Sequence, residues 1–352
     1  MTGTGVNPQQ VAWISGRATT QVVESCCFPP RGVAIAIVSL YTSTESEFAM
    51  TSDPVATDFD PALKLARFLP RTVITGRTAG LLRRLTGLGA LVSPKGGEVV
   101  RCDENVPVRV FRPGAPDILR PGVLFIHGGG YVIGSAAMGD GMCRNIAAKL
   151  GAVAASVEYR LAPQHPYPAP LEDCYRALRW LADQPDVDSS RIAVVGESAG
   201  GGLAAALTLL AKERGDVLPA FQLLSYPMLD DRTTKRTDLD ESRFRVWSPR
   251  SNRYGWSAYL GSSITDVPPL AAPARYEDLT GLPPTWIGVG TNDLFYDEDV
   301  RYAKRLIDAG VPCTLFEVPG AYHGFDQIEA RSTPARDYRR EQLEALAAVI
   351  ST

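Results

Sequence analysis

The chain has 352 residues, of which 45% are hydrophobic and 21% are charged, and its formal net charge is −3. This length allows a large core in one big domain or two smaller ones, and the composition is ordinary for a soluble globular protein. Because Lys and Arg are not in excess, the charge excludes a protein dedicated to binding nucleic acid.

Cysteine and histidine are both rare. Six cysteines form no C-x-x-C pair, which predicts free thiols in a reducing compartment. The three histidines, His127, His165 and His323, are too few to favour a histidine metal site. The best apolar run, 32–41, is far shorter than the ~20 residues of a membrane-spanning helix, and it begins too late for a typical secretory signal. We therefore expect a cytoplasmic protein without stable membrane anchoring.

The amino-terminal part differs from the rest of the chain. Residues 1–49 show no sustained helical or strand period, so we interpret them as an extension: either a true arm or sequence upstream of the real start. The segment 60–70 predicts a helix with Asp before a proline at the first helical position. A second helix is expected over 73–88, with three leucines on one face.

From residue 96 onward, strand patterns alternate with helix patterns. Strands are expected at 106–112, 122–130, 153–159, 191–196, 221–226, 285–290 and 313–318. Helices are expected near 139–150, near 168–183, after Ser198, between the last two strands and at about 335–350. This alternation predicts the α/β class, a mainly parallel sheet with helices on both faces. The polar, aromatic-dotted segment 230–258 interrupts it and is expected to pass over the carboxyl edge of the sheet, where ligands bind in such folds.

A G-x-S-x-G motif spans residues 196–200, between an expected strand and an expected helix. It is typical of a nucleophile elbow, a sharp turn that exposes a serine and needs small neighbours. The motif alone also fits a packed strand-turn-helix that happens to contain Ser198.

Three consecutive glycines, Gly128, Gly129 and Gly130, follow His127 after another strand. Backbone without side chains can approach a substrate oxygen and offer N–H donors to a developing negative charge. The alternatives are a tight turn or a phosphate-binding loop. A dinucleotide site is disfavoured because the glycine spacing differs from G-x-G-x-x-G.

A serine nucleophile needs a base and a group that orients the base. His323 follows the strand at 313–318, and Asp293 follows the strand at 285–290, so both lie at the same sheet edge as Ser198. Each also has a non-catalytic interpretation: His323 as a loop or core histidine, and Asp293 as a helix-capping residue. Asp297 is an alternative candidate for the acid that orients the base. The chain order Ser198, Asp293, His323 is an order in which known serine, acid and histidine triads occur on parallel sheets of this kind.

Together these motifs make the chain resemble the hormone-sensitive-lipase-like group of the α/β-hydrolases, the bacterial esterases with an HGGG motif. The resemblance runs from about residue 60 to the end and is carried by HGGGY (127–131), YRLAPQHPYPAP (159–170), RIAVVGESAGGGLAA (191–205), LSYPMLD (224–230), PLAAPARYEDLTGLPP (269–284), DLFYDE (293–298) and YHGF (322–325). The departures are small: Glu197 stands where Asp is commoner, and Gln164 replaces a usual Glu.

The resemblance implies that Ser198 is the nucleophile, His323 the general base and Asp293 its orienting acid. It implies an oxyanion hole of backbone N–H groups from Gly129, Gly130 and Ala199, with Gly128 as a further candidate. His127 and His165 then have structural roles. The implied domains are cap helices in 50–95, aided by part of 230–258, and a catalytic domain over 96–352.

The implied activity is hydrolysis of short- to medium-chain carboxylic esters through an acyl-enzyme, with no metal or organic cofactor. We expect a small-molecule ester as the partner, and a homodimer as the candidate assembly. Four aromatic residues are expected either to line the substrate pocket or to serve ordinary packing: Tyr131, Phe244, Trp247 and Phe295.

Other functions use the same residues. The triad could act on amides or lactones, or transfer the acyl group to an alcohol. A ligand-binding protein on this fold, similar to the plant hormone receptors that have lost the catalytic histidine, is disfavoured because Ser198, Asp293 and His323 are all present.

Overall fold

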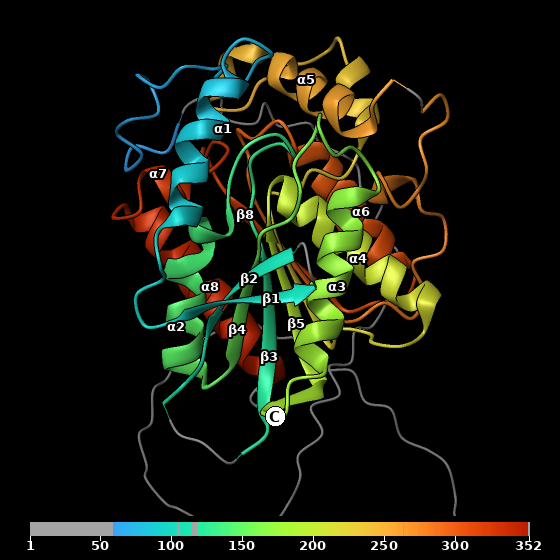
Figure 1. The fold of residues 1–352 in the computed structure, drawn as a ribbon. Coiled ribbons are helices and arrows are strands. Elements are labelled where there is room, and N and C mark those ends of the chain that lie inside the picture. Colours follow the sequence, from blue (N-terminus) through green and yellow to red (C-terminus); the bar gives the residue numbers. More distant parts are fainter. Residues whose placement is uncertain (1–58, 104–105, 115–117, 263, 351–352) are drawn as a thin grey trace, which may run out of the picture. The chain divides into compact units, whose positions relative to one another are not determined.

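The computed structural model describes residues 59–103, 106–114, 118–262 and 264–350. Its strands are β1 (Glu98–Asp103), β2 (Val106–Phe111), β3 (Arg120–Ile126), β4 (Val153–Val157), β5 (Val187–Glu197), β6 (Phe221–Ser225), β7 (Thr285–Gly290) and β8 (Cys313–Val318). Within these residues they form one sheet in the order β1-β2-β4-β3-β5-β6-β7-β8 (Figure 1). β2 is antiparallel to both of its neighbours, and all remaining pairs are parallel.

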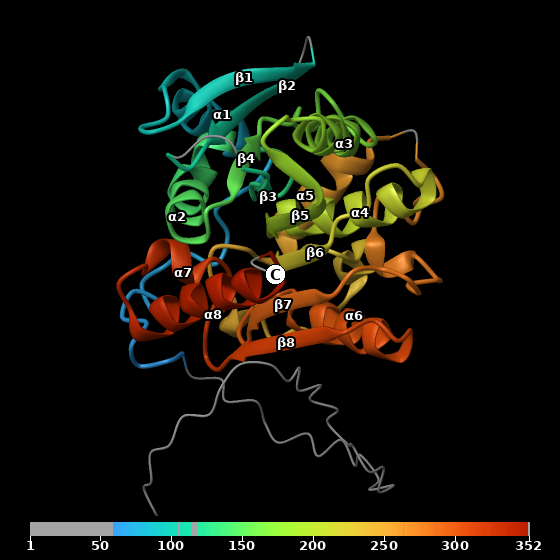
Figure 2. The same cartoon turned by 90° about the horizontal axis from the view of Figure 1, so that it is seen from below.

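Helices cover both faces of this sheet. The α-helices are α1 (Ala79–Gly87), α2 (Asp140–Leu150), α3 (Ala169–Ala182), α4 (Ala199–Arg214), α5 (Pro249–Leu260), α6 (Tyr296–Asp308), α7 (Phe325–Ile328) and α8 (Thr333–Ile350). Short 3-10 turns are η1 (Leu88–Leu91), η2 (Ala136–Gly139), η3 (Asp231–Lys235), η4 (Glu241–Arg243) and η5 (Pro273–Arg275). α2 and α8 pack on one face, and α3, α4 and α6 pack on the other (Figure 2). The predicted α/β class is therefore confirmed. None of the described helices has the length and apolar character to cross a membrane.

The apolar strands explain why the sheet is central. Successive residues of β3 alternate between two core clusters: Leu124 and Ile126 belong to one, and Val123 and Phe125 to the other. Because side chains alternate across a strand, each of these clusters fills one face of the sheet. All seven predicted strands are present. β1 was not predicted, since it is a short edge strand with several exposed side chains.

The predicted helix over 60–70 is wrong, because residues 60–69 form a series of turns instead. Their backbone groups are bound by distant side chains. The N–H of Leu65 donates to the Glu329 carboxylate at 3.1 Å, and the carbonyl of Ala66 accepts from Arg245 Nε at 2.6 Å. Tertiary contacts thus override a helix-like local pattern.

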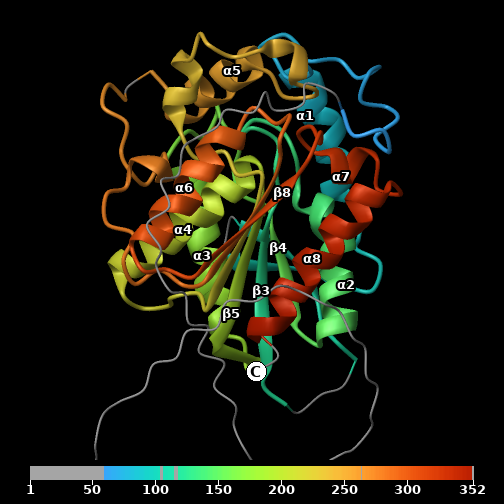
Figure 3. The ribbon, with the colours of Figure 1, turned by 180° about the vertical axis from the view of Figure 1, so that it is seen from behind.

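The segments before α1 and around α5 are joined by hydrogen bonds. The hydroxyls of Thr72 and Ser248 lie 2.7 Å apart, and Ser251 Oγ donates to the carbonyl of Ile74 at 2.7 Å. These contacts hold the backbone out of the helix predicted from residue 73, so α1 begins at Ala79. Figures 1 and 3 show α1 and α5 side by side at one end of the sheet.

Candidate active site

An unbroken chain of hydrogen bonds joins the three residues that the sequence singled out. Ser198 Oγ lies 2.9 Å from His323 Nε2, and His323 Nδ1 lies 2.8 Å from Asp293 Oδ2. The other carboxylate oxygen of Asp293 accepts the N–H of Phe295 at 3.0 Å. All three side chains are buried. This is the geometry of a nucleophile, a base and an acid that orients the base.

The turn at Ser198 is a strained one. Ser198 joins the end of β5 to the start of α4 with φ 54° and ψ −120°, a conformation that L-residues rarely adopt. Its N–H donates to the carbonyl of Ser225 at 2.8 Å, and its carbonyl accepts from Met228 at 2.9 Å, which holds the turn in place. A Cβ at Gly200 would lie 2.1 Å from the carbonyl oxygen of Ile126, so that position requires glycine.

The glycine loop after β3 lies against this turn. A Cβ at Gly128 would be 3.3 Å from the Cβ of Ser198, which places the loop backbone beside the serine. Among the described residues, the N–H groups of Gly129 and Gly130 donate no hydrogen bond. Ala199 is the first residue of α4, where backbone N–H groups have no partner within the helix. Free donors therefore gather beside Ser198.

Three aromatic rings surround the imidazole of His323. The ring centroids of Tyr226, Phe295 and Trp247 lie 4.9, 5.3 and 6.2 Å from that of His323. These rings restrict rotation of the imidazole and keep water from these sides. Tyr226 was not predicted as a site residue, although it lies in the LSYPMLD motif.

The other predicted pocket residues are placed differently. Tyr131 stacks on Tyr259 with 3.9 Å between ring centroids, and its hydroxyl donates to the carbonyl of Met228 at 3.2 Å. Phe244 is buried in the same core cluster. Trp247 and Phe295 are thus the two predicted pocket residues that the aromatic contacts place next to His323.

The loops that carry the acid and the base are bound to each other. The N–H of Asn292 donates to the carbonyl of Ala321 at 3.0 Å, and the N–H of Gly320 donates to Thr291 Oγ1 at 2.8 Å. The rival acid lies apart: Asp297 forms an ion pair with Arg236 and is half-exposed. Asp293 alone of the two contacts the histidine.

His127 is buried and faces the protein. Its ring stacks on Tyr159 at 4.2 Å, and Nδ1 lies 2.8 Å from the carbonyl of Gly128. Burial lowers the pKa of His127 to about 4, so the ring is neutral at physiological pH. His165, by contrast, is exposed.

Behind the elbow lies a second group of polar residues. Glu197 accepts from Gln327 Nε2, and Asp326 accepts the hydroxyl of Tyr226 at 2.8 Å. Burial, together with the charge of Asp326, raises the pKa of Glu197, and burial raises that of Asp326. No pattern in the sequence singled out Asp326 or Gln327, because Tyr226 and Glu197, the site residues that they contact, lie 100 and 130 positions away. No cluster of His, Cys, Asp and Glu suited to a metal ion occurs in the part of the chain that the structure describes.

Comparison with known proteins agrees with this geometry. A family model described as alpha/beta hydrolase fold matches residues 123–327. "Esterase LipI" of Mycobacterium tuberculosis is 38% identical over 220 residues, which cover 60% of this chain and 68% of the relative. "Ethyl acetate hydrolase" of Pseudomonas putida is 34% identical over 245 residues, covering 64% and 73%. The solved structure titled "Bacterial Heroin Esterase" has a TM-score of 0.74 and 36% identity, and the match covers 83% of this chain and 98% of that one. The chain therefore belongs to the α/β-hydrolase family.

Proposed function

We propose that the protein is a serine carboxylic-ester hydrolase that works through an acyl-enzyme. The observation that carries the proposal is the hydrogen-bond chain from Ser198 through His323 to Asp293, with distances of 2.9 and 2.8 Å. The names of the relatives support the same reaction class, since all three proteins quoted above are named as ester-cleaving enzymes.

His323 Nε2 takes the proton of Ser198 as Oγ attacks the ester carbonyl carbon. Asp293 holds the imidazole with Nδ1–H toward its carboxylate and stabilises the imidazolium that forms. The C–O bond to the alcohol then breaks as His323 returns the proton to the leaving oxygen. In the second half-reaction His323 takes a proton from water, which attacks the acyl carbon. The bond to Ser198 Oγ then breaks, and His323 returns the proton to Oγ as the acid leaves.

The tetrahedral intermediate carries its negative charge on the former carbonyl oxygen. In this mechanism, the N–H groups of Gly129, Gly130 and Ala199 bind that oxygen, and Gly128 is the remaining candidate. The unused donors of the glycine loop support this assignment. Donors fixed in advance need no reorganisation during the reaction, which is why they lower the barrier.

Short- to medium-chain esters are the proposed substrates. Trp247 and Phe295 stand beside His323 and offer an apolar wall for a small acyl or alcohol group. We propose that the segments around α1 and α5 form the cap over this site. A Cβ at Gly255 of α5 would lie 3.0 Å from the carbonyl oxygen of Gly130, so α5 packs on the glycine loop.

Hydrolysis of p-nitrophenyl esters from acetate to palmitate, measured beside Ser198→Ala, tests the proposal. We expect turnover that peaks at short chains and is lost in the variant. A folded protein that cleaves none of these esters would overturn it, and amides, lactones and acyl transfer would then be assayed.

The location and assembly of the protein are separate proposals. Among the described residues, Cys143, Cys174 and Cys313 are free thiols, which supports a reducing, cytoplasmic location. Cell fractionation tests the location. Sedimentation equilibrium tests the expected homodimer.

A further inference from the structure

The Glu197 carboxylate and the Gln327 amide connect two parts of the active site. Gln327 Nε2 lies 2.9 Å from one carboxylate oxygen of Glu197 and 2.8 Å from the other. Glu197 is the last residue of β5 and directly precedes Ser198, while Gln327 lies on α7, four residues after His323. The contact therefore joins the nucleophile strand to the segment that carries the base.

This contact runs beside the hydrogen bond between Ser198 and His323. It spans the same two chain segments, one residue before the serine and four residues after the histidine. A change in the distance between β5 and α7 would alter both contacts together. The Glu197–Gln327 pair is suited to fix that distance, because Glu197 is only 8% exposed and cannot swing away.

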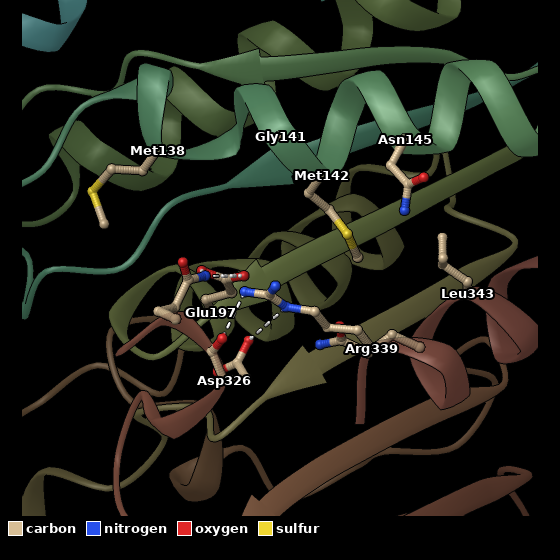
Figure 4. A pocket seen from close by; sticks show the side chains of 10 residues that line it. Met138, Gly141, Met142, Asn145, Glu197, Asp326, Arg339 and Leu343 are labelled. Atoms are coloured by element: carbon tan, nitrogen blue, oxygen red, sulfur yellow. Dashed lines mark hydrogen bonds and ion pairs between the residues drawn. The ribbon is translucent and has the colours of Figure 1, made fainter. Parts of the chain in front are cut away.

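Gln327 is itself held in place by its neighbours. The adjacent Asp326 accepts the hydroxyl of Tyr226 at 2.8 Å, and its carbonyl accepts from Arg339 Nη2 at 2.6 Å. Figure 4 shows Arg339 of α8 reaching Asp326, with Glu197 beside them. α7 is thus held by Tyr226, the residue directly after β6, and by Arg339 of α8, so Gln327 is a fixed point to which Glu197 can bind.

The length of the Glu197 side chain decides whether the contact forms. Aspartate at this position would be shorter by one C–C bond of about 1.5 Å. From the same backbone position, its carboxylate would lie beyond hydrogen-bond distance of Gln327 Nε2.

We propose that Glu197 and Gln327 are positioning residues that set the distance between Ser198 and His323. The inference rests on the proposed function, because it assigns these residues to the same reaction. Glu197 and Gln327 do not touch the substrate. They act through the two catalytic side chains, and the reach of Glu197, not its charge, is what matters.

The space around Glu197 and Gln327 allows either side chain to be replaced without a change in the fold. A cavity of about 400 Å³ lies next to it, lined by residues of α2, α7 and α8 that include Met142, Asn145 and Leu343 (Figure 4). Water can occupy the space that a shortened side chain leaves, since the cavity has polar groups to bind it. Variants at 197 and 327 should therefore fold.

Four variants separate reach from charge. Glu197→Asp keeps the carboxyl group and loses the reach, whereas Glu197→Gln keeps the reach and replaces the carboxyl group with an amide that cannot ionise. Gln327→Met removes the amide at similar volume. Asn145→Ala, from the same cavity wall but outside the contact, is the control. Each is assayed for kcat and KM with p-nitrophenyl butyrate, for the rate of Ser198 phosphonylation by a p-nitrophenyl phosphonate, and for thermal unfolding.

We expect kcat and the phosphonylation rate to fall by about 5- to 50-fold in Glu197→Asp and Gln327→Met, because a misplacement near 1 Å can cost up to about 100-fold. KM should change by less than twofold. Glu197→Gln should recover most of the lost rate, and Asn145→Ala should match the wild type. The double variant Glu197→Asp/Gln327→Met should be no slower than either single variant, since both remove one contact.

Wild-type rates in Glu197→Asp and Gln327→Met would overturn the inference. The inference would also be overturned if kcat and the phosphonylation rate fell in Glu197→Gln and not in Glu197→Asp, because the carboxyl group, not its reach, would then be what matters. A fall in thermal stability with unchanged kcat would mean that the contact is structural only. Failure of the proposed function gives a different result: the wild type itself then neither cleaves the ester nor reacts with the phosphonate.

Discussion

Gly130 lies directly against the indole ring of Trp247. A Cβ at Gly130 would be 2.2 Å from Cη2 of Trp247, and the backbone there has φ +60°. Gly130, whose N–H is a proposed oxyanion donor, is thus in direct contact with Trp247, the tryptophan beside His323. A side chain at 130 must displace either the ring or the loop.

Gly130→Ala should therefore lower kcat by about 10²–10³-fold, the usual cost of losing one oxyanion donor. The measurement is steady-state hydrolysis of p-nitrophenyl butyrate. Gly141→Ala is the matched control, because nothing lies within 4 Å of a Cβ at that position on α2. Equal kcat values for the two variants would contradict the assignment of Gly130 to the oxyanion hole.

Trp247→Ala should shift the chain-length preference toward longer esters. The indole lies beside Phe295 and His323, so its removal opens space next to the reacting atoms. The ratio of kcat/KM for octanoate to that for acetate is expected to rise. Because Trp247 is buried, the variant should also lose about 3–5 kcal/mol of unfolding free energy. An unchanged ratio in a folded variant would place Trp247 outside the pocket.

Asp293→Asn should reduce kcat by about 10⁴-fold, as expected when the histidine is left in the wrong tautomer. Asp297→Asn is the comparison, since Asp297 is half-exposed and pairs with Arg236. Its kcat should change by less than about threefold, because Asp297 does not contact His323 and loses only a partly exposed ion pair, which contributes little. A large loss of kcat in Asp297→Asn with little loss in Asp293→Asn would instead make Asp297 the acid that orients His323.

Glu298→Gln should make stability less dependent on pH. Burial raises the pKa of Glu298 to about 8, so the folded protein keeps a proton that the unfolded chain releases near pH 4.5. Stability then falls as pH rises between these values, by at most about 1.4 kcal/mol per unit, and stays reduced above pH 8. One oxygen of Glu298 accepts the N–H groups of Leu229 and Asp230 at 2.8 and 3.1 Å, and a glutamine oxygen can do the same.

Urea unfolding at pH 5 and pH 8.5 measures this effect. The variant should resemble the wild type at pH 5 and be more stable than it at pH 8.5. Glu277→Gln, at an exposed position, should follow the wild type at both values. A variant less stable than the wild type at pH 8.5 would mean that the ionised carboxylate is the stabilising form.

The strands and the candidate site were predictable because local signals agreed with each other. Ser198 stood between a strand and a helix, and Asp293 and His323 each followed a strand in the order that this fold uses. Parallel strands bring such ends to one sheet edge, so residues 125 positions apart could be placed together.

The turns at 60–69 and the residues behind the elbow could not be predicted in this way. The former are set by side chains such as Glu329 and Arg245, which lie more than 170 residues away. Likewise, nothing near Tyr226 in the sequence points to Asp326. Such pairs depend on the reach of single side chains across the finished fold, and periodicity carries no information about them.

The hydrogen bonds between the acid loop and the base loop, from Asn292 N–H to the Ala321 carbonyl and from Gly320 N–H to Thr291 Oγ1, have a consequence for redesign. Asp293 and His323 form a module that does not need the serine for its assembly. A different nucleophile at position 198 would meet an acid–base pair that is already aligned. Transplanting the two loops together, not one at a time, is the way to move this pair into another hydrolase.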